Sequence, residues 1–198
     1  KAEHGVETTP QTFIDGKRIG GYTELREHFG HDSGDAEGTS YRPVIAVFAV
    51  GAALAIALSL FVFQLPFTIR TAEWFVAFSM AMLAMLKLQD VEQFSTMFVG
   101  YDLLGRKWVP YAYAYPYLEA TAAILMAGRL LPWLSIPVAL FIGAVGAISV
   151  FYAVYIQKRS IKCACVGGSA NVPLGFVSLS ENLAMIGMAI WMLLRPTL

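Results

Sequence analysis

The sequence has little cysteine and little charge: only two of its 198 residues are cysteines, and 14% are charged. Two cysteines are too few for a disulfide-stabilised scaffold, and their C-x-C spacing is not a usual structural zinc pattern. The basic residues form no patch with interleaved aromatic residues, which argues against a nucleic-acid partner. The sequence begins at a lysine with no charged-then-apolar leader, so we expect further residues upstream.

Apolar residues are abundant, and at 57% of the sequence they place it in the membrane class. Five apolar segments approach or exceed the roughly 20 residues that cross about 30 Å of hydrocarbon. These segments are residues 43–66, 71–88, 110–131, 133–157 and 173–194. The short connection "GRLLPW" between the third and fourth predicts an antiparallel helical hairpin. The sequence therefore predicts an all-α integral membrane helical bundle over residues 42–198, in contact with the lipid bilayer.

Lysine and arginine are distributed unequally between the two sets of predicted connections. Short loops that retain positive charge are expected on the cytoplasmic side of a membrane. The richer set contains Arg42, Lys87, Arg106, Lys107, Lys158, Arg159 and Lys162, and the other contains Arg70, Arg129 and Arg195. We therefore expect the N-terminus and the cysteine-containing loop in the cytoplasm, and the C-terminus outside.

The first 29 residues are polar and predict a small soluble fragment. An apolar run "TFI" precedes a turn "DGKR", and "GGYTELREHF" predicts a loop that opens a short helix. Residues 30–41 are rich in Gly, Ser and Asp and predict a flexible linker.

The stretch "TTPQTFIDGKRIGGYTEL" resembles the C-terminal half of a glutaredoxin, which implies a partial thioredoxin-like α/β fragment and glutathione as a ligand. By this resemblance Thr9 and Pro10 would align the glutathione cysteine, and Gly21, Tyr22 and Thr23 would hold its γ-glutamyl carboxylate. A cis-proline before a strand and free N–H groups at a helix start suit these tasks. These residues lack the C-x-x-C or C-x-x-S motif of a glutaredoxin. Either the chain begins within the domain, or the domain has lost its chemistry.

The runs "MLAMLKLQDVEQF", "YPYLEATAAILMAGRLLP" and "VSLSENLAMIGMAIWML" resemble the MauE/DoxX family of small redox-associated membrane proteins. The resemblance covers about residues 72–194. It implies a four-helix core made of the second to fifth predicted helices, with the first helix as a tether for the soluble fragment. It also implies a multi-pass protein of the bacterial-type inner (plasma) membrane.

The two cysteines, Cys163 and Cys165, lie in "IKCACVGG" beside Lys158, Arg159 and Lys162. Nearby cations favour the thiolate, which is the reactive form of cysteine. A C-x-C disulfide closes a small strained ring, so it favours exchange over a structural role. The alternative interpretation is two small residues at a helix end without a function of their own.

Two predicted helices each carry a carboxylate, Glu119 and Glu181, about 13 Å from the cytoplasmic side at 1.5 Å per residue. We expect them to share one layer with Ser178, Ser180 and Asn182, next to Pro116. Such a layer can carry a proton, bind a cation or form a neutral hydrogen-bonded contact between helices. Asp90 and Glu92 are expected at the interface, with a possible role facing the cysteine loop.

Two functions follow from these residues. The first is a thiol–disulfide relay, in which a cytoplasmic glutaredoxin-like domain exchanges disulfides or glutathione adducts with Cys163 and Cys165. Such a protein would be a thiol–disulfide oxidoreductase with glutathione or a thiol protein as its partner. The alternative is a transporter of a soft metal ion, Hg²⁺ or Cu⁺, with the thiolates at its cytoplasmic mouth and Glu119 and Glu181 along its path. A weaker possibility is an assembly factor for a partner enzyme during disulfide maturation.

Overall fold

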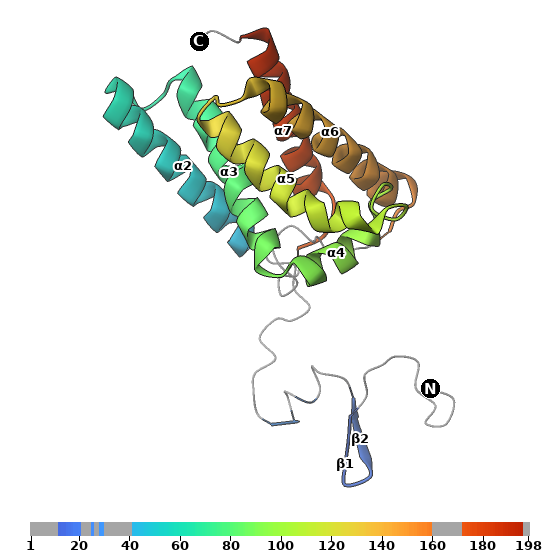
Figure 1. The fold of residues 1–198 in the computed structure, drawn as a ribbon. Helices are drawn as coiled ribbons and strands as arrows, with labels where there is room; N and C mark the ends of the chain where they lie inside the picture. The colour runs from blue at the N-terminus through green and yellow to red at the C-terminus, as the bar shows by residue number, and fades with distance from the viewer. Residues whose placement is uncertain (1–11, 21–24, 26–27, 30–40, 160–171, 196–198) are drawn as a thin grey trace. The chain divides into compact units, whose positions relative to one another are not determined.

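The computed structural model describes residues 12–20, 25, 28–29, 41–159 and 172–195. The chain divides into two compact units, Lys1–Gly38 and Thr39–Leu198. The helices described below belong to the second unit (Figure 1).

In the first unit, β1 (Thr12–Ile14) pairs antiparallel with β2 (Lys17–Gly20). Asp15 and Gly16 connect them with φ angles of 51° and 74°, the conformation that a tight two-residue hairpin turn requires. The predicted apolar run "TFI" therefore forms β1, and the predicted turn "DGKR" is limited to Asp15 and Gly16, because Lys17 and Arg18 already belong to β2. A two-stranded hairpin occurs in many folds and does not identify a thioredoxin-like one. The predicted glutathione contacts lie outside the described residues: Thr9, Pro10, Gly21, Tyr22 and Thr23.

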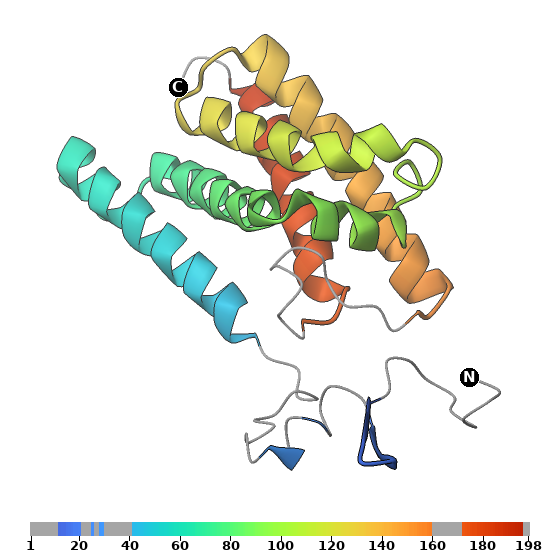
Figure 2. The ribbon, with the colours of Figure 1, turned by 60° about the horizontal axis from the view of Figure 1, so that its bottom comes forward.

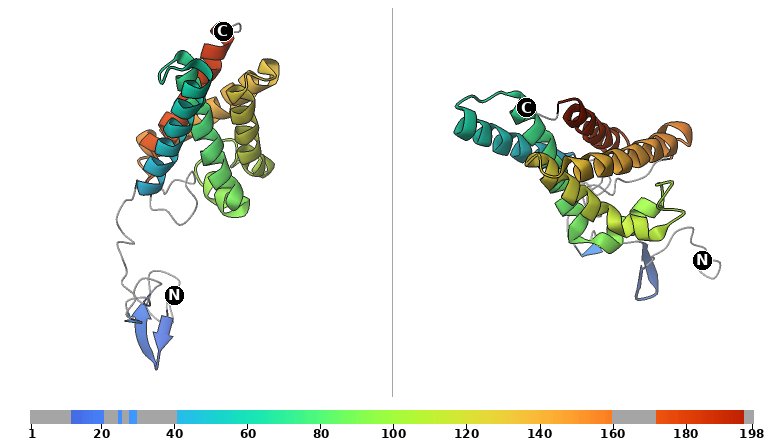
Figure 3. Two further views of the ribbon diagram at one scale, coloured as in Figure 1. Left: turned by 90° about the vertical axis from the view of Figure 1, so that its left-hand side faces the viewer. Right: turned by 45° about the horizontal axis from the view of Figure 1, so that its top comes forward.

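The second unit is a bundle of long helices. They are α2 (Arg42–Phe63), α3 (Ile69–Gln89), α5 (Val109–Ala127), α6 (Pro132–Phe151) and α7 (Phe176–Leu194). A short helix α4 (Val91–Val99) follows α3, and α6 continues into a π-helical turn η2 (Tyr152–Ile156). α3 packs against α5 and α7, and α6 also packs against α5 and α7, which makes a closed four-helix core (Figures 1 and 2). α2 packs on the outside against α3 (Figure 3).

Four of the described helical segments are long and apolar enough to cross a membrane: α2, α3, α7, and α6 together with η2. The remaining predicted span, 110–131, corresponds to α5, which is not among these four. α5 contains four tyrosines, two prolines and Glu119, so it is less apolar than its neighbours. It is nevertheless a continuous helix, and it lies between α3 and α6 in the core.

Helix starts and turns explain the alternating direction of the core helices. Thr68 caps α3 by accepting from the Thr71 N–H, and the Thr71 hydroxyl accepts from the Thr68 N–H in return. Between α5 and α6, the Leu130 N–H donates to Leu125 O at 2.7 Å, and Pro132 begins the next helix. This tight turn makes the predicted antiparallel hairpin.

The connection between α3 and α5 differs from the loop that the sequence predicted over residues 88–109. It contains α4, which Asp90 caps by accepting from the Gln93 N–H at 2.8 Å. Phe94 and Phe98 form a buried face of α4. The centre of the Phe98 ring lies 4.7 Å from the centre of the Tyr115 ring on α5. Apolar residues at helical spacing therefore close this end of the core, which we name the α4 end.

Candidate functional site

A buried charged layer joins three helices of the core. The Lys87 amine on α3 donates to both carboxylate oxygens of Glu119 on α5, at 2.8 and 2.6 Å. It also donates to Oε1 of Glu181 on α7 at 2.5 Å. The side chains are 3%, 0% and 3% exposed, respectively. The two glutamates therefore do share one layer, as the sequence predicted.

The prediction that Lys87 belongs to a cytoplasmic connection is wrong. The residue lies in the last turn of α3, and its side chain points into the core. Its long aliphatic chain can bury along apolar neighbours while the amine reaches a polar partner. Sequence alone could not choose between this direction and the membrane surface, although a single lysine inside "MLAMLKLQ" was a signal.

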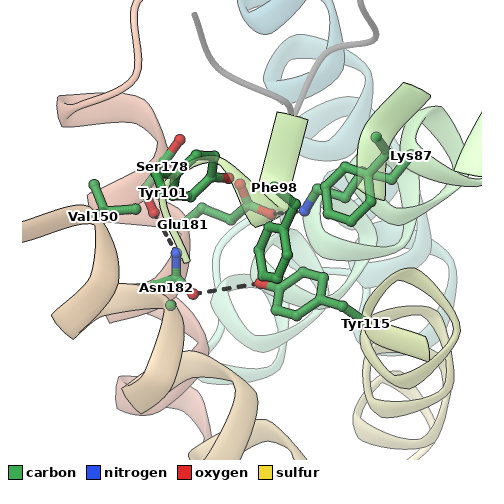
Figure 4. Close-up of a pocket in the computed structure, with 10 residues that line it drawn as sticks. Lys87, Phe98, Tyr101, Tyr115, Val150, Ser178, Glu181 and Asn182 are labelled. Atoms are coloured by element: carbon green, nitrogen blue, oxygen red, sulfur yellow. Dashed lines mark hydrogen bonds and ion pairs between the residues drawn. The ribbon is translucent and has the colours of Figure 1, made fainter. Parts of the chain in front are cut away.

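Aromatic and amide groups surround the charged layer (Figure 4). The Lys87 amine lies 5.4 Å from the centre of the Tyr115 ring, a cation–π distance. The Tyr115 hydroxyl donates to Asn182 Oδ1 at 3.5 Å, and the Asn182 amide donates to Ser178 O at 2.7 Å. The Ser180 hydroxyl instead donates to Val177 O within its own helix.

A small cavity of about 10 Å³ lies beside the layer. Its polar lining includes Lys87, Tyr101, Glu181 and Asn182. A polar cavity of this size has room for about one water molecule. A water in this cavity would lie in contact with both Lys87 and Glu181 of the layer.

Gly146 on α6 leaves the space that Asn182 needs. A β-carbon at this glycine would lie 2.2 Å from Asn182 Oδ1 and 2.9 Å from its Cγ. We expect Gly146→Ala to lower the free energy of unfolding by about 1–3 kcal/mol, the usual cost of overpacking a core. Gly187→Ala on α7 is the matched control, because a β-carbon there meets nothing within 4 Å. Denaturation in detergent micelles measures both, and equal midpoints would contradict the role of Gly146.

The segment after α4 buries a second titratable group, Asp102. Its Oδ1 accepts from the N–H groups of Leu104 and Gly105 at 3.0 and 2.7 Å, while Oδ2 has no partner among the described residues. Burial raises the pKa of Asp102 above its usual value, although the Gly105 N–H and the nearby Ser149 hydroxyl favour the charged form. Burial also raises the pKa of Tyr101 well above its usual value, so its hydroxyl stays protonated.

A second ionic cluster lies at the opposite end of the core, where α3 begins and α7 ends. Glu73 accepts from Arg129 Nη2 at 2.5 Å and from the Trp191 indole at 2.9 Å, and it also binds Arg70. Both arginines belong to the connections that the sequence predicts on the outer side. Arg70 belongs to α3 like Glu73, whereas Arg129 follows α5 and Trp191 is on α7, so this cluster holds three segments together at this end of the core.

The structure describes both flanks of the cysteine loop but not the cysteines. Cys163 and Cys165 lie outside the described residues. Before them, Arg159 Nη1 donates to Gly100 O at 2.9 Å, which ties the end of η2 to the α4 end. After them, the buried residues Val172 and Leu174 lead into α7. The loop therefore starts and finishes at the end of the core nearer to the charged layer.

The remaining predicted site residues are Asp90, Glu92 and the residues proposed as metal ligands. Asp90 is exposed and caps α4, and Glu92 is exposed in the first turn of α4. Within the ranges that the structure describes, no group of three or more His, Cys, Asp or Glu residues is placed to hold a metal ion. The cation that lies between Glu119 and Glu181 is the Lys87 amine.

The helices and the buried charged layer define a multi-pass α-helical membrane protein. Residues 65–195 match the family described as methylamine utilisation protein MauE, a range that includes α3 to α7 and all three charged residues of the layer. The chain therefore belongs to the MauE family. No curated protein and no solved structure matches the sequence significantly. The family match does not reach residues 1–29, so the resemblance to glutaredoxin depends on the sequence motif alone.

Proposed function

We propose that this MauE-family protein is a membrane thiol–disulfide relay whose reactive pair is Cys163 and Cys165. The observation that carries the proposal is the position of this C-x-C pair, within the family domain and directly after a group of cations. Lys158 and Arg159 precede the pair, and Lys162 adjoins it. Cations that are this close in the sequence favour the thiolate form of cysteine, which is the form that attacks a disulfide.

The chemistry is a two-step exchange. One loop thiolate attacks a partner disulfide, forms a mixed disulfide and releases one partner thiolate. The second loop thiolate then attacks the loop sulfur of the mixed disulfide, closes the Cys163–Cys165 bond and releases the second partner thiolate. The loop loses two electrons, the partner disulfide gains them, and the two thiol protons pass to the released thiolates.

Glutathione is the partner that the N-terminal segment favours by its resemblance to glutaredoxin. Thr9, Pro10 and the Gly21–Thr23 segment would hold it, and they would present it to the loop cysteines if both lie on one side of the membrane. The distribution of charge supports a shared cytoplasmic side even without Lys87. Connections at the α4 end carry Arg106, Lys107, Lys158 and Arg159.

The soft-metal alternative uses the same cysteines but requires a cation path through the core. Glu119 and Glu181 would line that path, and in the described residues the Lys87 amine already neutralises part of their charge. A second cation between them would be repelled by this amine at close range. The geometry therefore favours the relay over ion transport.

An exchange assay tests the relay. The fully reduced chain, reconstituted in lipid nanodiscs, is mixed with oxidised glutathione, trapped in acid and weighed by mass spectrometry. We expect a chain that is lighter by two hydrogen atoms, with two glutathione thiols released per chain. A chain that stays reduced, or that stops at a stable glutathione adduct, would overturn the proposal.

A further inference from the structure

We propose that the layer of Lys87, Glu119 and Glu181 is a proton-binding site, which holds one exchangeable proton between its two carboxyl groups. The inference does not depend on the thiol relay. It begins from the charges: one ammonium and two carboxylates meet in one place, so the fully ionised layer would carry one net negative charge.

Among the described residues that line the cavity beside the layer, none other than Lys87 carries a positive charge. From α5 the layer meets Tyr115, from α7 Ser178 and Asn182, and from the segment after α4 it meets Tyr101. α4 contributes Phe94 and Phe98, and α6 contributes Gly146 and Val150. Asp102, which follows Tyr101 in the chain and is buried, would add negative charge if it were ionised. An unpaired charge in such a place costs several kcal/mol, and one bound proton removes that cost.

The contacts of the Lys87 amine leave a position for this proton. The amine binds both oxygens of Glu119 but only Oε1 of Glu181. Because one amine binds both carboxyl groups, at 2.6 and 2.5 Å, the two groups lie side by side around it. The neutral state is therefore an ammonium, one carboxylate and one carboxylic acid, and the proton is shared between the two acids.

The same region offers a way in for the proton. The layer lies nearer to the α4 end, because Lys87 is in the last turn of α3 and Glu181 is in the second turn of α7. The one-water cavity touches both Glu181 and Tyr101. Next to Tyr101 in the chain, Asp102 has a buried oxygen without a partner, and the Tyr111 hydroxyl is also buried without a partner among the described residues. These are the buried polar groups on this side of the layer through which we expect the proton to pass.

Infrared spectroscopy of the full chain in lipid nanodiscs tests the site at neutral pH. An Asp102→Asn background removes the other buried acid of this region. We expect a carbonyl-stretch band of a protonated carboxyl group that shifts when the sample is exchanged into D₂O. Absence of this band would overturn the proposal without any further variant.

Variants then assign the band. Glu119→Gln and Glu181→Gln each leave one ammonium and one carboxylate, a neutral pair that needs no proton, so each alone is expected to abolish the band. Lys87→Met leaves two acids without a cation, so the band is expected to double. Glu73→Gln is the control, because that carboxylate is held by two arginines and should contribute nothing. A band that persists in both glutamine variants would contradict the site.

Discussion

Replacement of Lys87 by methionine is expected to lower the free energy of unfolding of the bundle by about 3–5 kcal/mol, the usual cost of removing one partner from a buried ion pair. Methionine has nearly the same length and is apolar, so the loss of packing is small. What remains is two carboxyl groups in the core, on side chains that are 0% and 3% exposed. Both must then bind protons, so the deficit should shrink as the pH falls and grow as it rises.

Controls within the chain separate this effect from a general loss of charge. Lys107→Met removes an exposed lysine of the segment between α4 and α5 and is expected to change stability by less than about 0.5 kcal/mol. Adding Glu119→Gln to Lys87→Met removes one of the two buried acids that lack a cation. The double variant should therefore regain part of the lost free energy of unfolding. Unfolding in detergent, followed by the loss of helix signal over a range of pH, measures all three. Equal stability of Lys87→Met and Lys107→Met would show that the layer is not a stabilising ionic contact.

Cys163→Ser and Cys165→Ser are each expected to abolish thiol–disulfide exchange. A single remaining thiol can form a glutathione adduct, but it cannot close the loop disulfide or release the second glutathione. Glu119→Gln should retain exchange, because the loop thiols exchange protons with water. The acid-trapped mass assay separates the oxidised chain from the adduct. Full exchange in either serine variant, or its loss in Glu119→Gln alone, would contradict the relay.

α3, α6 and α7 followed from hydropathy and length because each is long and apolar enough to cross a bilayer, whereas α5 is less apolar and is a core helix through its packing against α3 and α6. The shared layer of Glu119 and Glu181 was also predictable, since both lie at a similar depth in predicted spans that begin on the same side of the membrane. α4 was not predicted: its nine residues carry Gln, Glu, Ser and Thr, and only packing against Tyr115 shows why Phe94 and Phe98 form a buried face.

Lys87, Tyr101 and Asp102 show what sequence could not supply at the site. A lysine near the end of an apolar helix fits the membrane surface as well as the core, and the choice depends on acids that are 32 and 94 residues away. Asp102 is polar and follows a short helix, which is typical of an exposed turn. It is buried because the segment after α4 packs against the end of α6, where the Leu103 N–H donates to the Ser149 hydroxyl.

The family match and the four-helix core cover the same helices, α3 to α7. The family match begins after α2, which fits the interpretation of that helix as an addition to a four-helix core. The charged layer and the two described flanks of the cysteine loop, Arg159 and Val172, lie toward the same end of this core. The layer and the loop are separate features, because one binds a proton in our account and the other exchanges electrons.

The most direct test of the relay is a redox titration of the loop cysteines. The full chain in nanodiscs is equilibrated across a series of glutathione redox buffers, and Cys163 and Cys165 are trapped by alkylation, with and without one equivalent of Hg²⁺ or Cu⁺. We predict a reversible two-electron transition near the glutathione potential of the cytosol, with little protection of the thiols by metal. Thiols that stay reduced throughout the series but are shielded tightly by metal would contradict the relay and identify the loop as an ion-binding site.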